Sequence, residues 1–236
     1  MTREERLRRA GILLDRFTDD VLTFVLIIIF LFGIYFIYDS AYLYNNASDR
    51  GSLRFKPDTE TGDTALKLPD SVAWITLDGT PIDYPVMQGE DNMEYIDKNP
   101  YGEYSLSGSI FLDSRNSPDF TDGYSLIYGH HMEGGLMFGS LDRYFNEEYL
   151  DAHRTGLLVT KDQIYRVSVF AVIHIYSTNS VIFDPGEHPE EEVWKFVEDK
   201  AEIFREPEEG RLLALSTCTD NIPDNRSVVM CTIRER

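Results

Sequence analysis

The stretch RLLALSTCTDNIPDNRSVVMCTIRER (residues 211–236) holds two apolar segments and both cysteines of the chain. The segments RLLALSTC and SVVMCTI have the apolar, partly β-branched composition of strands. The loop between them, TDNIPDN (219–225), is rich in Asp, Asn and Pro, which favour turns. The pattern predicts an antiparallel hairpin in which Cys218, at the end of the first strand, lies across the loop from Arg226.

The predicted hairpin decides how the two cysteines relate to each other. Cys231 lies five residues beyond Arg226, which is roughly 17 Å at ~3.4 Å per residue. Because the Cα atoms of a disulfide lie within ~7 Å of each other, a bond between Cys218 and Cys231 is incompatible with the hairpin. Cys231 lies two residues from both Val229 and Ile233, so the three share one face of the predicted strand. Cys231 is therefore predicted to be a buried core thiol. Cys218, beside a polar loop and a guanidinium, is predicted to be a reachable thiol that can be activated.

The region 71–236 is predicted to be mostly β, with added helices. Short apolar segments separated by turns recur in it: VAWITL (72–77), IDYPVMQ (82–88), GSIFLD (108–113), YSLIYGH (124–130), GLLVT (156–160) and IYRVSVFAVIHIY (164–176). Many short strands of this kind favour a closed or nearly closed barrel. Two helices are predicted between the strands, FGSLDRYFNEEYL (138–150) and HPEEEVWKFVEDKAEIF (188–204). The second places Ala201 and Phe204 on its apolar stripe.

Residues 21–38, VLTFVLIIIFLFGIYFIY, carry no charge and no proline. At ~1.5 Å per residue they span roughly 27 Å, about the thickness of the hydrocarbon core of a bilayer. A buried core helix is one alternative, but with Asp19, Asp20 and Asp39 at its ends it would need a large domain around it. A cleaved signal peptide is another, but its apolar region is usually ~7–15 residues and ends in a small-residue cleavage site. The segment is therefore predicted to be an uncleaved transmembrane anchor.

The basic residues around this segment predict its orientation. Within 15 residues after it only Arg50 appears, whereas five arginines precede it: Arg3, Arg6, Arg8, Arg9 and Arg16. Positive charge stays on the cytoplasmic side, so the N-terminus is predicted to be inside. The chain is thus predicted to be a single-pass protein of the cell membrane, with a cytoplasmic head (1–20), an anchor (21–38), a stalk (39–70) and an extracellular catalytic domain (71–236).

The formal net charge of the chain is −19. Five arginines and five acidic residues cancel within the first 20 residues, so the excess negative charge belongs to the outer part. An acidic surface argues against nucleic acid as a partner, because the phosphate backbone is bound by basic residues. The lipid bilayer is the partner that the apolar anchor predicts.

An activated thiol needs a proton partner, which is usually histidine. The strand YSLIYGHH (124–131) ends in His130 and His131, and MEGGLMFGS (132–140) then leads into the first predicted helix. A histidine at the rim of a barrel, beside a glycine-bearing loop, is where a site can form. A zinc site of His130, His131 and Glu133 is disfavoured because adjacent residues on a strand point to opposite faces.

Three motifs resemble those of the sortase family, the membrane-anchored transpeptidases of Gram-positive surfaces. LSTC (215–218), YGHHM (128–132) and RSVV (226–229) look like the Cys, His and Arg motifs of the family in the expected order. YPVMQGEDNMEYI (84–96) and SGSIFLDSRN (107–116) are similar to class B of the family. The resemblance covers nearly the whole chain and implies a sortase-like closed β-barrel behind an N-terminal transmembrane helix.

By position, the resemblance implies a catalytic set in which Cys218 is the nucleophile, His130 the acid and base, and Arg226 the cation beside the oxyanion. His131 falls where many relatives have asparagine, and strand alternation allows only one of the two histidines to face Cys218. We choose His130. Asp220 either orients His130 or caps the loop, and the loop role is favoured. The positions that the matching motifs assign to the substrate groove are Asn92, Tyr128, Ser216 and Thr217.

The resemblance also implies a cysteine transpeptidase that uses no cofactor and no metal. Its donor is a C-terminal sorting signal of the NPxT[NG] type on a surface protein, cleaved after the threonine through a thioacyl intermediate. Its acceptor is an amine of a cell-wall precursor peptide or a pilin lysine, and the sequence does not choose between these. Two alternatives stay open: a membrane-anchored cysteine hydrolase of wall peptides, and a non-enzymatic wall-binding module that kept the fold.

Overall fold

The computed structural model describes residues 3–47, 51–62, 64–218 and 224–236. Contacts divide the chain into two units, Met1–Asn45 and Asn46–Arg236. The α-helices are α1 (Arg3–Ala47), α2 (Glu147–Ala152), α3 (Ser180–Phe183) and α4 (Glu190–Lys200). The short 3₁₀ helices are η1 (Ser52–Phe55), η2 (Glu133–Gly135) and η3 (Gly139–Phe145). The strands are β1 (Ser71–Leu77), β2 (Asp83–Met87), β3 (Ile110–Leu112), β4 (Tyr124–Tyr128), β5 (Thr155–Thr160), β6 (Ile164–Tyr176), β7 (Ile203–Phe204), β8 (Arg211–Cys218) and β9 (Asn225–Glu235).

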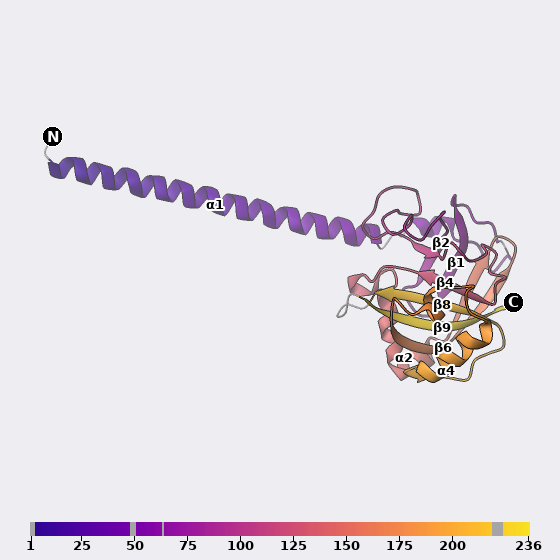
Figure 1. Cartoon of the computed structure of the whole chain (residues 1–236). Coiled ribbons are helices and arrows are strands. Elements are labelled where there is room, and N and C mark those ends of the chain that lie inside the picture. The colour runs from indigo at the N-terminus through magenta and orange to yellow at the C-terminus, as the bar shows by residue number, and fades with distance from the viewer. Residues whose placement is uncertain (1–2, 48–50, 63, 219–223) are drawn as a thin grey trace. The chain divides into compact units, whose positions relative to one another are not determined.

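Helix α1 contains the apolar segment that the sequence predicts as an anchor, residues 21–38, and continues on both sides of it (Figure 1). The stretch Gly11–Tyr42 is long and apolar enough to cross a membrane. Its large side chains are exposed, with Phe30 at 67% and Ile37 at 72% of their full accessible surface. A helix that is apolar on all sides and uncovered suits a lipid environment.

Among the described residues nine strands form one sheet, and eight of them close into the predicted barrel (Figure 1). Their order is β5-β1-β2-β3-β4-β8-β9-β6, and pairing of β5 with β6 closes the ring. The pairs β2–β3 and β4–β8 are parallel, and the others are antiparallel. Parallel neighbours need long connections. This is why β4 and β8, which lie side by side, are far apart in the sequence.

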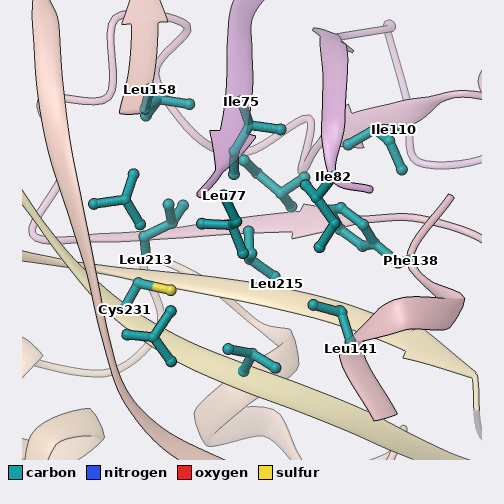
Figure 2. Packing of buried hydrophobic residues seen from close by; sticks show 14 of the residues in the cluster. Ile75, Leu77, Ile82, Ile110, Phe138, Leu141, Leu158, Leu213, Leu215 and Cys231 are labelled. Atoms are coloured by element: carbon teal, nitrogen blue, oxygen red, sulfur yellow. The ribbon is translucent and has the colours of Figure 1, made fainter. Parts of the chain in front are cut away.

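Alternate residues of the barrel strands point inward and form the largest core. Figure 2 shows part of this core, with Ile75 and Leu77 of β1 and Leu213 and Leu215 of β8 among its members. Cys231 of β9 also lies here, 0% exposed and paired with Leu213 in the ladder. Burial raises the pKa of the Cys231 thiol. The prediction of a core thiol at Cys231 is confirmed.

The outer face of β4, β8, β9 and β6 is covered by helices α3 and α4. Leu126 of β4, Ala214 of β8 and Met230 of β9 form a second cluster with Ile182 of α3 and Val193 of α4. The residues that alternate with them along the strands belong to the barrel interior. In β4, β8 and β9 the positions thus alternate between the interior and the outer face, whereas β6 has an irregularity between Val169 and Ala171.

The helix predicted at 138–150 is divided at Asn146. The first part is the 3₁₀ helix η3, and α2 begins at Glu147. Asn146 has an extended backbone, with φ −105° and ψ 124°, and its side chain accepts a hydrogen bond from the backbone N–H of Tyr149. Because asparagine is a preferred N-cap, Asn146 starts a new helix instead of continuing the previous one.

The helix predicted at 188–204 ends at Lys200, so the placement of Ala201 and Phe204 on its apolar stripe is wrong. Ala201 is extended, with ψ 134°. Phe204 belongs to β7, which pairs with the part of β6 that continues beyond β5. The open edge of β6 offers backbone hydrogen bonds, and these outweigh the helical pattern of the sequence.

Part of the segment that the sequence assigns to the stalk, 39–70, packs onto the barrel. Phe55, Leu66 and Leu68 cluster with Trp74 of β1. The Nζ atom of Lys56 forms a 2.7 Å ion pair with Asp83 of β2. The folded unit therefore begins before residue 71.

Candidate active site

The ends of three neighbouring strands bring the predicted catalytic positions together. In the β8–β9 hairpin Cys218 pairs directly with Arg226. In the parallel β4–β8 ladder Tyr128 pairs with Ser216. His130 lies two residues beyond Tyr128, and Cys218 lies two residues beyond Ser216. The register thus brings His130 and Cys218 to the same level, and neighbouring strands are ~4.8 Å apart.

The two neighbouring histidines have different surroundings. His131 lies 2.8 Å, through Nε2, from Oδ2 of Asp142 in η3. The other carboxylate oxygen of Asp142 accepts a 2.8 Å hydrogen bond from the hydroxyl of Ser227 in β9. Ser227 lies two residues before Val229, which points into the barrel. Ser227 therefore faces the interior, and its neighbour Arg226 faces the outer side of the strand. Of the two histidines, His130 lines the same cleft as Arg226.

This cleft has a volume of about 430 Å³, within the ~300–1,000 Å³ that is usual for ligand pockets. It is lined by all six of the predicted site residues whose side chains the structure describes: Asn92, Tyr128, His130, Ser216, Thr217 and Arg226. The side chain of Cys218 and the whole of Asp220 lie outside the described part of the chain. The apolar residues of the lining were not predicted from the sequence; they are Met93, Ile96, Phe111 and Phe183.

His130 is held by the backbone of the loop between β2 and β3. Its Nε2 lies 2.7 Å from the carbonyl oxygen of Ile96. Because a carbonyl oxygen can only accept, the proton is assigned to Nε2, and Nδ1 of the neutral ring keeps its lone pair. Gly108 of the same loop has a left-handed φ of 57°, and a Cβ at this position would lie 2.3 Å from the Ile96 oxygen. Only glycine fits this approach without displacement of the carbonyl.

The buried carboxylate of Asp113, directly after β3, organises one wall of the cleft. It accepts hydrogen bonds from Arg115 at 2.8 and 2.9 Å, from Nδ2 of Asn92 at 2.9 Å and from the hydroxyl of Tyr128 at 3.1 Å. Burial by itself would raise the pKa of Asp113, but the hydrogen bonds from Arg115 and Asn92 outweigh it, and the pKa is lowered. Conversely, burial and the neighbouring Asp113 raise the pKa of Tyr128. One ionised group thus holds three residues of the cleft.

Arg115 continues this network to the part of the cleft lining at the end of α3. Its Nη1 lies 2.7 Å from Oδ1 of Asp184, and its Nη2 donates to the carbonyl oxygen of Phe183 at 2.6 Å. Asp113 and Arg115 lie within SGSIFLDSRN, and no role was predicted for them from the sequence. A carboxylate and a guanidinium directly after a buried strand were the signal in the sequence that could have pointed to this network. Their partners, however, lie 21 and 69 residues away in the sequence, at Asn92 and Asp184.

The hydroxyls of Ser216 and Thr217 are buried and have no hydrogen-bond partner among the described residues. A buried hydroxyl left unpaired costs roughly 1–3 kcal/mol, so a bound molecule that hydrogen-bonds to it recovers this free energy. Thr217 alternates with Ser216 and shares the interior side with Leu215. Ser216, on the outer face, is the better placed of the two to contact a bound molecule.

Metal-ligating side chains do not gather in the part of the chain that the structure describes. No group of three or more His, Cys, Asp or Glu residues there could hold a metal ion. Glu133, which belongs to the disfavoured zinc set, lies in η2 and is exposed. The absence of a metal and of a cofactor remains a prediction.

Comparison with known proteins gives matches over most of the barrel. The family model described as "Sortase domain" matches residues 75–234. Sortase B of Listeria monocytogenes is 39% identical over 121 residues, which cover 51% of this chain and 48% of that protein. The chain thus spans about half the length of this curated relative.

Two solved structures are similar in fold. One is a Streptococcus pyogenes class B sortase involved in pilus biogenesis, with a TM-score of 0.65 and 41% identity, covering 70% of this chain and 92% of that one. The other is a Staphylococcus aureus sortase B–substrate complex, with a TM-score of 0.65 and 28% identity, covering 72% of this chain and 82% of that one.

Proposed function

The chain belongs to the sortase family, and on this premise we propose that it is a class B cysteine transpeptidase acting on surface proteins. The observation that carries the proposal is the meeting of three strand ends at one cleft, where Cys218 pairs with Arg226 and His130 follows β4. A thiol, an imidazole and a guanidinium are groups that serve acyl transfer. Strand alternation predicts that the Cys218 thiol opens on the same face as Ser216.

In the proposed first half-reaction the Cys218 thiol gives its proton to Nδ1 of His130. A free thiol has a pKa of ~8.5, which a neighbouring imidazolium or guanidinium lowers. The thiolate sulfur bonds to the carbonyl carbon of the substrate threonine, and Arg226 stabilises the tetrahedral oxyanion. His130 returns the proton to the leaving amine as the C–N bond breaks. A thioacyl enzyme and a free amine remain.

In the second half-reaction an acceptor amine replaces the leaving amine. Neutral His130 takes a proton from the acceptor as its nitrogen bonds to the thioacyl carbon. The C–S bond breaks, the thiolate of Cys218 recovers a proton from His130, and a new amide bond has formed. Water in place of the amine would give hydrolysis instead.

We infer that the donor is a C-terminal sorting signal of the NPxT[NG] type. The apolar walls at Met93 and Ile96 suit the proline of such a signal, and the unpaired hydroxyl of Ser216 suits its backbone. The Staphylococcus aureus relative was solved as a substrate complex. For the acceptor, a cell-wall peptide amine and a pilin lysine are both retained, and the Streptococcus pyogenes relative is involved in pilus biogenesis.

We further propose that α1 anchors the protein in the cell membrane, with the N-terminus in the cytoplasm and the catalytic domain outside. The span Gly11–Tyr42 and the five arginines at or before Arg16 support this orientation. Protease added to intact protoplasts should remove the domain 71–236. A protected domain would reverse the proposed orientation.

The activity is tested on the detergent-solubilised full chain with an NPQTN peptide and two acceptors, triglycine and a lysine-bearing pilin-like peptide. We expect a ligated product with one acceptor and a thioacyl adduct on Cys218 by mass spectrometry, both lost in Cys218→Ala. Unchanged product in Cys218→Ala would refute the assignment. Hydrolysis that no amine diverts would assign the hydrolase alternative, and a thiol that alkylates like an ordinary exposed cysteine, with no turnover, would assign the wall-binding module.

A further inference from the structure

One chain of charged groups joins two parts of the cleft lining. The first part carries Asn92 and Tyr128, and both side chains are bound to the buried carboxylate of Asp113. Phe183 and the following Asp184, at the end of α3, form another part of the lining. Arg115 contacts Asp113 on one side and the α3 end on the other. Arg115 therefore joins these two parts by direct contacts, beside the 2.8 Å hydrogen bond that the Tyr124 hydroxyl donates to the carbonyl oxygen of Ile182 in α3.

The contacts of Arg115 use the fork of the guanidinium. Nε and Nη2 donate to the two oxygens of Asp113, while Nη1 reaches Asp184 and Nη2 also reaches the carbonyl of Phe183. An ammonium group is a single point of charge and cannot span two acceptors in this way. Arg115 itself is partly exposed, at 39% of its side-chain surface, whereas Asp113 is at 0%. The network thus runs from the buried carboxylate of Asp113 to the partly exposed side chain of Arg115 at the cleft.

Asn92 is fixed at both ends by the same part of the chain. Its Nδ2 donates to Asp113 at 2.9 Å, and its Oδ1 accepts from the backbone N–H of Ser114 at 2.8 Å. The reacting positions are held by different groups. His130 is bound to the Ile96 carbonyl, and Nη1 of Arg226 donates to a neighbouring carbonyl. The network around Asp113 is therefore separate from the groups that orient the chemistry.

We propose that the Asp113–Arg115–Asp184 bridge is a positioning device that sets the width of the cleft and thereby the affinity for the sorting peptide. The inference rests on the proposed function and deepens it. The bridge makes no bond to the reacting atoms, so it acts on peptide binding and leaves the rate of the chemical steps unchanged. Asp184, at the exposed end of the bridge, can be changed with little effect on folding, because 37% of its side-chain surface is accessible.

The test measures binding and turnover separately. Binding of an NPQTN peptide is titrated calorimetrically on the full chain carrying Cys218→Ala, and KM and kcat are measured with Cys218 present. We expect Asp184→Asn to raise Kd and KM about 3- to 10-fold, since one charge-assisted contact is lost. Arg115→Lys should raise both by about 10-fold or more, because the fork is lost entirely. In both variants kcat and the rate of Cys218 alkylation should stay at the wild-type level.

The matched control is Asp151→Asn. Asp151 is also a surface carboxylate paired with an arginine, lying 2.8 Å from Arg205, and it does not line the cleft. It should leave Kd and KM unchanged. Melting temperatures of all variants establish that each is folded.

Unchanged Kd in both Asp184→Asn and Arg115→Lys would overturn the inference, and so would a loss of kcat at constant KM. The proposed function fails in a different way. A wild-type chain that binds the peptide but never forms a thioacyl adduct would refute transpeptidation, while the Kd series would still decide the role of the bridge. A wild-type chain that binds no sorting peptide would overturn both.

Discussion

A methyl group added at Gly108 should slow the enzyme from a distance, through the carbonyl that holds His130. Gly108 has a φ of 57°, and a Cβ there would lie 2.3 Å from the Ile96 oxygen and 2.7 Å from the Tyr95 oxygen. An ordinary C···O contact is ~3.3 Å, so the Ile96 oxygen must move by about 1 Å. The hydrogen bond from Nε2 of His130 is 2.7 Å long. A shift of this size takes it out of the usual range of ~2.7–3.2 Å.

Two effects determine how far Gly108→Ala lowers the stability and the acylation rate: the left-handed backbone and the hydrogen bond of His130. A left-handed conformation costs an alanine about 1–2 kcal/mol, which lowers the free energy of unfolding without touching the site. The lost hydrogen bond is worth about 0.5–1.5 kcal/mol, or about a 2- to 12-fold reduction in the acylation rate if it is needed to orient His130. We therefore expect Gly108→Ala to be both less stable and slower.

Gly102 offers a matched control in the same loop. Its φ is 83°, and a Cβ there would meet no atom within 4 Å. Gly102→Ala should thus show the stability loss of the left-handed backbone while acylating at the wild-type rate. Stability is followed by thermal unfolding, and acylation by mass spectrometry of quenched mixtures with an NPQTN peptide. Equal acylation rates for the two variants would refute the role assigned to the Ile96 carbonyl.

Three further outcomes test other parts of the molecule. Cys231→Ser places a hydroxyl in the barrel interior, so the free energy of unfolding should fall by about 1–3 kcal/mol. The melting temperature should then be lower by about 2–4 °C per kcal/mol, and an unchanged value would contradict the burial of Cys231. Asp142→Asn replaces one of the two carboxylate oxygens that join His131 to Ser227 by an NH₂ group, so we expect the free energy of unfolding to fall by about 1–3 kcal/mol. Turnover should stay at the wild-type level because His130 is the proposed acid and base, and a lower kcat would contradict that choice. Arg226→Lys keeps the charge but loses the planar fork, so steady-state assays should show slower turnover with peptide binding retained; near-normal turnover would show that the fork is not needed.

The alternation of apolar residues made the hairpin and the core position of Cys231 predictable, because both depend on residues close together in the sequence. The helix through Phe204 was not predictable in its extent, since the open edge of β6 that captures this residue is created by other strands. The same limit applies to Asp113. Its position after a strand is typical of a turn residue, and its role as the anchor of a wall depends on partners far along the chain.

The lines of contact that build the cleft all join segments distant in sequence. β4 pairs with β8 some 88 positions later, as in Tyr128 with Ser216, and the bond from His130 to Ile96 spans 34 positions. Contacts of this kind form slowly, because large loops must close before they are gained. The proposed nucleophile, Cys218, and its proposed proton partner, His130, are therefore apart until the barrel has closed. An incompletely folded chain therefore carries the Cys218 thiol without the groups proposed to activate it, so closure of the barrel is the step that assembles the proposed site.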